Sequence, residues 1–161
     1  MGDRANFQGG IAMRETTRSI LLWALMALAW PGLAAAQTPK SVLESFGYIG
    51  HWAQDCSRKA EPGNPHLITS VLRSGGVELR NKLGAEYEDN VNIVLEARSL
   101  GPDKVWIKSK LNNKELREWE VMRQGGRIRT MVNRKPDGTL ITKDGVVVSS
   151  NKPTPWLSRC K

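Results

Sequence analysis

The sequence predicts one all-β domain, a single up-and-down antiparallel β-barrel of about eight or nine strands. Between residues 46 and 150, short β-rich segments alternate with turn residues about every 8 to 12 positions, a spacing typical of barrels and sandwiches. The pairs Gly75-Gly76, Gly125-Gly126 and Asp144-Gly145 are typical of tight hairpin turns, because glycine readily adopts positive φ. Since consecutive hairpins leave two exposed edges, closure of the sheet on itself is the expected arrangement.

A short helical segment at residues 38–45 is expected to lead into the strands. The expected strands are residues 47–55, 66–73, 77–83, 91–99, 104–111, 115–123, 127–133, 139–143 and 146–150. A two-residue loop at Gly75-Gly76 would place Arg73 opposite Glu78 and Leu72 opposite Leu79. Opposite charges then meet on one face and apolar side chains on the other, which favours this register.

Two further hairpins predict which face of the strand at residues 115–123 lies inside the barrel. The expected pairs are Val121 with Thr130, Trp119 with Val132, Ile107 with Trp119 and Lys108 with Glu118. Both hairpins therefore place the same four side chains inward: Arg117, Trp119, Val121 and Arg123.

The first 36 residues have the pattern of a cleavable signal peptide. Arg14 and Arg18 precede an apolar run at residues 20–30, and three alanines at residues 34–36 form a small-residue cleavage site. The run is too short to span a bilayer comfortably, so no stable membrane anchor is expected. We expect cleavage near Ala36, with Met1 or Met13 as the start, and a β-barrel domain at residues 37–161 in the periplasm or outside the cell.

The two cysteines, Cys56 and Cys160, both lie in the part of the chain expected to be exported. An oxidising compartment makes a disulfide the default expectation. Such a bond would join the two ends of the domain across a loop of about 100 residues, where the chain-entropy contribution is large.

The formal net charge of +8 favours acidic partners in general. Acidic side chains are interspersed among the basic ones, and export argues against a genomic role, so no nucleic-acid partner is expected. The two histidines, His51 and His66, are too few for a zinc site once both cysteines are committed to a disulfide. Phosphate-binding loops, dinucleotide fingerprints and nucleophile elbows do not occur, so neither a cofactor nor catalysis is expected.

Arg117 and Arg123 stand out because they share the expected inward face with Trp119 and Val121. One interpretation is that both lie near strand ends and extend their charged groups into water over apolar stems. The other is a basic mouth above an apolar barrel, which suits an amphiphile with an anionic head. The four residues are the candidate ligand-binding site.

The element Gly50-x-Trp52 resembles the first-strand signature of lipocalins and their calycin relatives, because it directly follows a short helical segment. In that family the tryptophan packs across the closed end of an eight-stranded barrel, often under an arginine from a late strand. The resemblance implies that Trp52 is the barrel plug, with Arg127 or Arg129 as its candidate partner.

A broader resemblance connects the chain with small exported proteins of proteobacteria. It rests on the run from Gly50 to Cys56, on Asn64-Pro65-His66, and on residues 153–160. It implies fold and compartment rather than an activity. A second exported class, the periplasmic inhibitors of secreted metalloproteases, is similar in size and in its single disulfide, and inserts an N-terminal trunk for which Gln37–Ser45 is the equivalent segment here.

The expected function is therefore a non-enzymatic periplasmic binding module, lipocalin-like, for a small apolar or anionic amphiphilic ligand or for a protein partner. The alternative is a protease inhibitor that acts through its N-terminal segment, and an enzyme is the third reading.

Overall fold

The computed structural model describes residues 37–112 and 114–161, and the predicted signal peptide lies outside these residues. The expected helical segment is α1 (Pro39–Phe46). Thr38 caps its start, because the Thr38 Oγ1 accepts a hydrogen bond from the backbone N–H of Ser41 at 3.2 Å. Gly47 ends the helix in the left-handed conformation at φ 76°. The helix packs on the barrel core, because Val42, Leu43 and Phe46 are buried in the core cluster.

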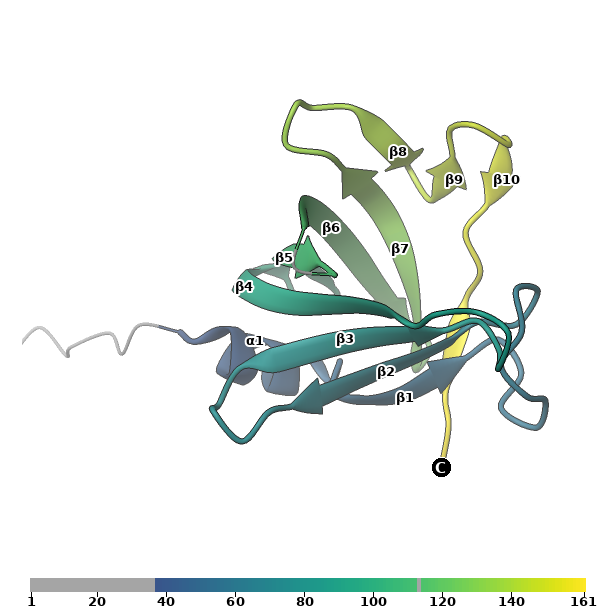
Figure 1. Cartoon of the computed structure of the whole chain (residues 1–161). Helices are drawn as coiled ribbons and strands as arrows, with labels where there is room; N and C mark the ends of the chain where they lie inside the picture. Colours follow the sequence, from purple (N-terminus) through teal and green to yellow (C-terminus); the bar gives the residue numbers. More distant parts are fainter. Residues whose placement is uncertain (1–36, 113) are drawn as a thin grey trace, which may run out of the picture. The chain divides into compact units, whose positions relative to one another are not determined.

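Eleven strands follow the helix in the described residues, all in antiparallel pairings (Figure 1). They are β1 (Gly50–Ala53), β2 (His66–Val71), β3 (Val77–Lys82), β4 (Asn90–Gly101), β5 (Lys104–Leu111), β6 (Glu115–Gln124), β7 (Arg127–Arg134), β8 (Leu140–Lys143), β9 (Val146–Val147), β10 (Lys152–Pro153) and β11 (Leu157–Arg159).

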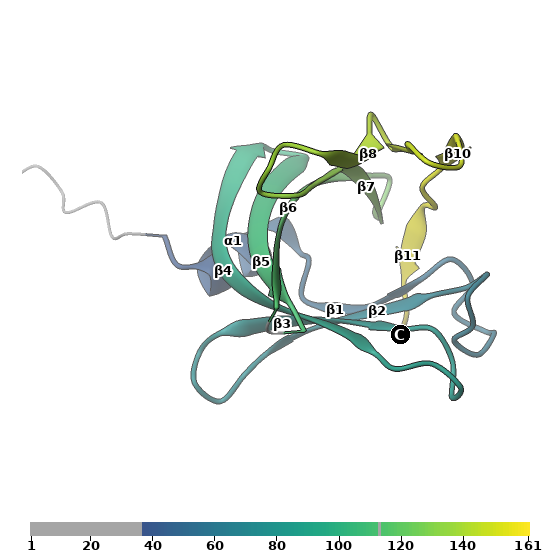
Figure 2. The same ribbon diagram turned by 45° about the horizontal axis from the view of Figure 1, so that its top comes forward.

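Eight of these strands close into an antiparallel barrel, which confirms the predicted fold class. Strands β1 to β7 pair in chain order, and β11 closes the ring between β7 and β1. Figure 2 shows β11 in this position, between β7 and β1. Residues 139–143 and 146–150, expected as barrel strands, are not part of the ring. Together with β10 they form an extension of β7 that we call the flap, residues 139–153.

The hairpin between β2 and β3 has a different register from the one expected. Ser70 faces Glu78 and Thr69 faces Leu79, so the predicted pairing of Arg73 with Glu78 is wrong. The reason is the turn: Leu72 N–H donates to the Gly76 carbonyl at 2.8 Å, which leaves a three-residue loop in which only Gly75 adopts positive φ, at 84°. Three-residue loops with glycine in this position are a common hairpin type, and they shift the pairing relative to a two-residue loop.

The registers on both sides of β6 agree with the expectation except at one residue. Ile107 faces Trp119, Lys108 faces Glu118, and Val121 faces Thr130. Trp119 faces Asn133 instead of Val132, because a β-bulge interrupts the β6–β7 ladder between Glu120 and Val121. The bulge therefore brings the amide side chain of Asn133 next to Trp119.

The barrel interior changes from apolar near α1 to polar at the opposite end. Apolar residues of the core cluster near α1 include Leu43, Phe46, Val105, Val121 and Ile128. Further along the strands, Asn92 and Ser109 are buried, with the Ser109 hydroxyl 3.4 Å from the Asn92 Oδ1. Buried polar side chains are costly unless they find hydrogen-bond partners, so a polar site is expected at this end of the barrel.

Candidate functional site

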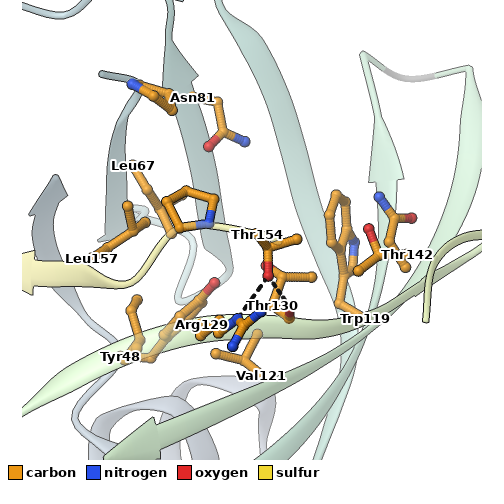
Figure 3. Close-up of a pocket in the computed structure, with 14 residues that line it drawn as sticks. Tyr48, Leu67, Asn81, Trp119, Val121, Arg129, Thr130, Thr142, Thr154 and Leu157 are labelled. Atoms are coloured by element: carbon orange, nitrogen blue, oxygen red, sulfur yellow. Dashed lines mark hydrogen bonds between the residues drawn. The ribbon is translucent and has the colours of Figure 1, made fainter. Parts of the chain in front are cut away.

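A pocket of about 210 Å³ is lined by residues of β2, β3, β6, β7, β8 and β11 and of the segments beside them (Figure 3). Its apolar lining consists of Tyr48, Pro65, Leu67, Trp119, Val121, Ile128, Pro155 and Leu157. Its polar lining consists of Asn81, Arg129, Thr130, Asn133, Thr142 and Thr154. An apolar pocket with a small number of polar groups is the usual form of a small-molecule site.

Trp119 forms a rigid wall of this pocket. Its indole N–H donates to the Ser109 Oγ at 2.7 Å, and Ser109 is fully buried. This hydrogen bond satisfies the one polar atom of the ring and fixes its orientation, so the flat apolar face remains available for packing.

Several neutral polar side chains line the pocket without a partner in the described part of the chain. The Asn133 Oδ1 is buried and accepts no hydrogen bond. The side chains of Asn81, Thr130 and Thr142 and the hydroxyl of Tyr48 also make no hydrogen bond to another described residue, although Tyr48 and Thr130 accept bonds through their carbonyls. Figure 3 shows Tyr48, Asn81, Thr130 and Thr142 around one space. Such groups are satisfied by water or by a ligand.

Arg129 holds the base of the flap. Its Nη2 donates to the Gly145 carbonyl at 2.6 Å and its Nε donates to the Thr154 Oγ1 at 3.1 Å. The Thr154 hydroxyl in turn donates to the Thr130 carbonyl at 2.7 Å. A Cβ at residue 145 would lie 2.9 Å from the guanidinium, so the close approach requires glycine there. The guanidinium is therefore already engaged by the flap and by Thr154.

The structure brings two of the four predicted site residues into the pocket, Trp119 and Val121. Arg117 pairs with Glu115, its Nη2 lying 2.7 Å from the Glu115 Oε2. Arg123 lies at the other end of β6, where its Nη1 donates to the Phe46 carbonyl at 2.6 Å. The two arginines do not line the pocket, and they do not meet at one mouth. The uncharged residues Asn133 and Thr142 were missed, because the bulge and the flap that position them have no clear sequence signal. Asn81 on β3 was also missed.

Trp52 is buried, with 3% of its surface exposed, and its indole N–H donates to the Tyr48 carbonyl at 2.8 Å. The arginine over its ring is Arg159, whose Cζ lies 5.7 Å from the ring centroid. Arg127 and Arg129, the candidates implied by the lipocalin resemblance, instead lie over Trp156. The partner comes from β11, because this strand closes the barrel beside β1.

A second polar cluster lies where β1 and β2 meet the loop at residues 54–65. The His51 Nε2 is 2.9 Å from the His66 Nδ1, and the His66 Nε2 is 3.2 Å from the Asn64 Nδ2. The Asn64 Oδ1 accepts from the Asp55 N–H at 3.0 Å, which orients the amide so that its Nδ2 donates. The Asn64 Nδ2 also donates to the Asp55 carbonyl at 2.9 Å, so the amide ties the loop to the histidine pair.

The pH dependence of folding follows from this pair. Burial, then His66 and then Lys82 lower the pKa of His51 below 6.5. As the pH falls, the unfolded chain therefore binds a proton at His51 at a higher pH than the folded chain does. The contribution of His51 to the free energy of unfolding is complete above about pH 6.5 and decreases as the pH falls below that value. We expect the urea midpoint to decrease between about pH 8 and pH 5. In His51→Gln this decrease of the urea midpoint should be smaller. An equal decrease in parent and variant would show that His51 does not cause the pH dependence.

The disulfide between Cys56 and Cys160 confirms the predicted pairing, with the two Cα atoms 5.4 Å apart. It joins the loop at residues 54–65 to the end of β11, where the Cys160 N–H also donates to the His51 carbonyl at 2.8 Å. The closing strand of the barrel is thereby tied to β1 both covalently and by hydrogen bonding.

The described residues contain no group of three or more histidine, cysteine, aspartate or glutamate side chains arranged to hold a metal ion. Within the same residues, no helix combines the length and apolar character needed to cross a membrane. In comparisons with known proteins, the chain matches no family model, no curated protein and no solved structure.

Proposed function

We propose that the protein is a non-enzymatic binding module that holds one small, largely apolar ligand inside the barrel. The observation that carries this proposal is the pocket of about 210 Å³ beside Trp119 and Val121, with an apolar lining and several uncharged polar groups. Small eight-stranded barrels are wide enough to hold one small ligand. The lipocalin-like character of the module is part of the same proposal and is supported by the eight-stranded barrel and the buried Trp52.

The periplasm is the proposed compartment. The Cys56–Cys160 disulfide supports it, because such bonds form and persist where the surroundings are oxidising. The N-terminal segment offers less support for the inhibitor alternative. From Pro39 to Phe46 it is helical, and Val42, Leu43 and Phe46 are buried in the barrel rather than available to a protease.

Native mass spectrometry of the protein purified from the exporting host tests the proposal. We expect a retained small-molecule mass that disappears in Thr142→Trp, because residue 142 lines the pocket and a larger side chain fills it. The matched control Thr139→Trp changes an exposed flap residue outside the pocket and should retain the mass. Both variants are first checked for an unchanged circular dichroism spectrum. A bound protease in place of a small molecule would favour the inhibitor alternative. A parent protein without any bound mass would count against a small-molecule ligand.

A further inference from the structure

The uncharged groups of the pocket carry an inference about the class of its ligand. The Asn133 Oδ1 is buried without a hydrogen-bond partner, on the strand directly opposite Trp119. Thr142 faces Asn133 across the β7–β8 pairing, so the two side chains belong to the same wall. A ligand without polar groups would displace water from this wall and leave its polar atoms unpaired, which disfavours binding.

The unpaired acceptor of the pocket disfavours a carboxylate, because the Asn133 Oδ1 accepts a hydrogen bond and a carboxylate has no proton to donate. Arg129 is the one charged residue among the described lining residues, and its Nε and Nη2 are directed to Thr154 and Gly145. Burial raises the pKa of Tyr48 well above its ordinary value of 10.0. The same loss of hydration penalises a carboxylate placed beside this hydroxyl.

The volume limits the size of the ligand. An engineered protein cavity of about 150 Å³ holds one benzene molecule. A pocket of about 210 Å³ thus holds about one ring with a small substituent, and a long acyl chain would extend out of it. The flat face of Trp119 suits such a ring, because aromatic and other planar groups stack on it.

We infer that the pocket takes an uncharged, ring-sized molecule with an amide or hydroxyl substituent, and that it discriminates against carboxylates of the same shape. This inference rests on the proposed function, since it names the ligand class of that same pocket. The ring packs between Trp119 and Leu157, and its substituent hydrogen-bonds to Asn133 and Thr142. It replaces the anionic amphiphile expected from Arg117 and Arg123, which do not line the pocket.

Three probes of nearly identical shape test the inference: benzamide, benzoate and isopropylbenzene. Binding to the full mature protein is measured by chemical-shift titration of the Trp119 indole N–H. We expect benzamide to bind at least about tenfold more tightly than either of the other two, because sites built for hydrogen bonding reject analogues that lack the group. Stronger binding of benzoate, or equal binding of isopropylbenzene, would overturn the inference while leaving the proposed function intact.

A variant links the preference to Asn133. Asn133→Leu removes the unpaired polar atom and should abolish the preference for benzamide over isopropylbenzene. Its melting temperature should be equal to or above that of the parent, since Asn133 Oδ1 makes no hydrogen bond in the folded protein. The control Thr139→Val should behave like the parent. A preference retained in Asn133→Leu would overturn the assignment, and failure of all three probes to bind the parent would remove both the inference and the small-ligand function.

Discussion

Cys56→Ser is expected to lower the free energy of unfolding by about 4 to 5 kcal/mol, the loop-closure value for a loop of about 100 residues. The sequence separation across the Cys56–Cys160 bond is 104 residues. The bond also holds β11, which closes the barrel through only two paired residues on each side. Loss of the bond should therefore both destabilise the fold and loosen the pocket, because Leu157 on β11 lines it.

Urea unfolding of mature parent and variant measures this effect. The double variant Cys56→Ser/Cys160→Ser should have the same stability as Cys56→Ser, since either change removes the same bond. The parent treated with reductant should approach the two variants. If Cys56→Ser unfolds at the parent's urea concentration, the bond contributes nothing to stability and β11 is held by its hydrogen bonds alone.

Arg123→Ala is expected to cost about 1.5 to 3 kcal/mol of stability, the range for a hydrogen bond that involves a charged group. The Arg123 Nη1 donates to the Phe46 carbonyl at 2.6 Å, its Nη2 donates to the Pro102 carbonyl at 3.3 Å, and its Cζ lies 5.1 Å from the Phe46 ring centroid. The side chain thus fastens the end of α1 to β6 and to the β4–β5 turn. Removing it weakens the attachment of α1, which then depends on the buried side chains Val42, Leu43 and Phe46.

The same variant distinguishes a structural role from a ligand-binding one. Because Arg123 does not line the pocket, Arg123→Ala should bind a pocket ligand with unchanged affinity at a temperature where it remains folded. The control Arg73→Ala removes an exposed arginine in the β2–β3 turn and should change stability by about 0.5 kcal/mol or less. If Arg123→Ala is as stable as the parent and binds the ligand more weakly, the structural role is wrong and Arg123 is a ligand-binding residue.

Local signals in the sequence predicted much of the fold. Gly125-Gly126 and Asp144-Gly145 were sufficient to locate two tight turns, because all four residues adopt the positive φ that such turns require. The side-chain alternation along residues 115–123 was sufficient for the inward face of β6, since side chains in a strand alternate between its two faces. The pairing of Cys56 with Cys160 followed from the cysteine count and the expected compartment.

The candidate site was predicted only in part. Trp119 and Val121 line the pocket as the alternation required, but alternation assigns a face and does not say what lies at each end of a strand. Arg117 and Arg123 share that face and have separate partners, Glu115 and Phe46, at opposite ends of β6. Glu115 lies on β6 itself, two residues before Arg117, but Phe46 lies in α1, so the partner of Arg123 could not be predicted from β6.

Sequence alone determined the features that depend on neighbouring residues: the β-rich alternation, most of the turns, the helix start at Thr38 and the one possible disulfide. Tertiary structure decided which segment closes the barrel. Residues 139–150 have the stronger strand pattern, but β11 is held beside β1 by the Cys56–Cys160 bond and by the Cys160 N–H. That placement leaves β8 to β10 as a flap, and the pocket exists because the flap and a one-residue bulge in β7 bring Thr142 and Asn133 to Trp119. Closure and bulges depend on contacts between residues distant in the chain, and such contacts leave little trace in a local pattern.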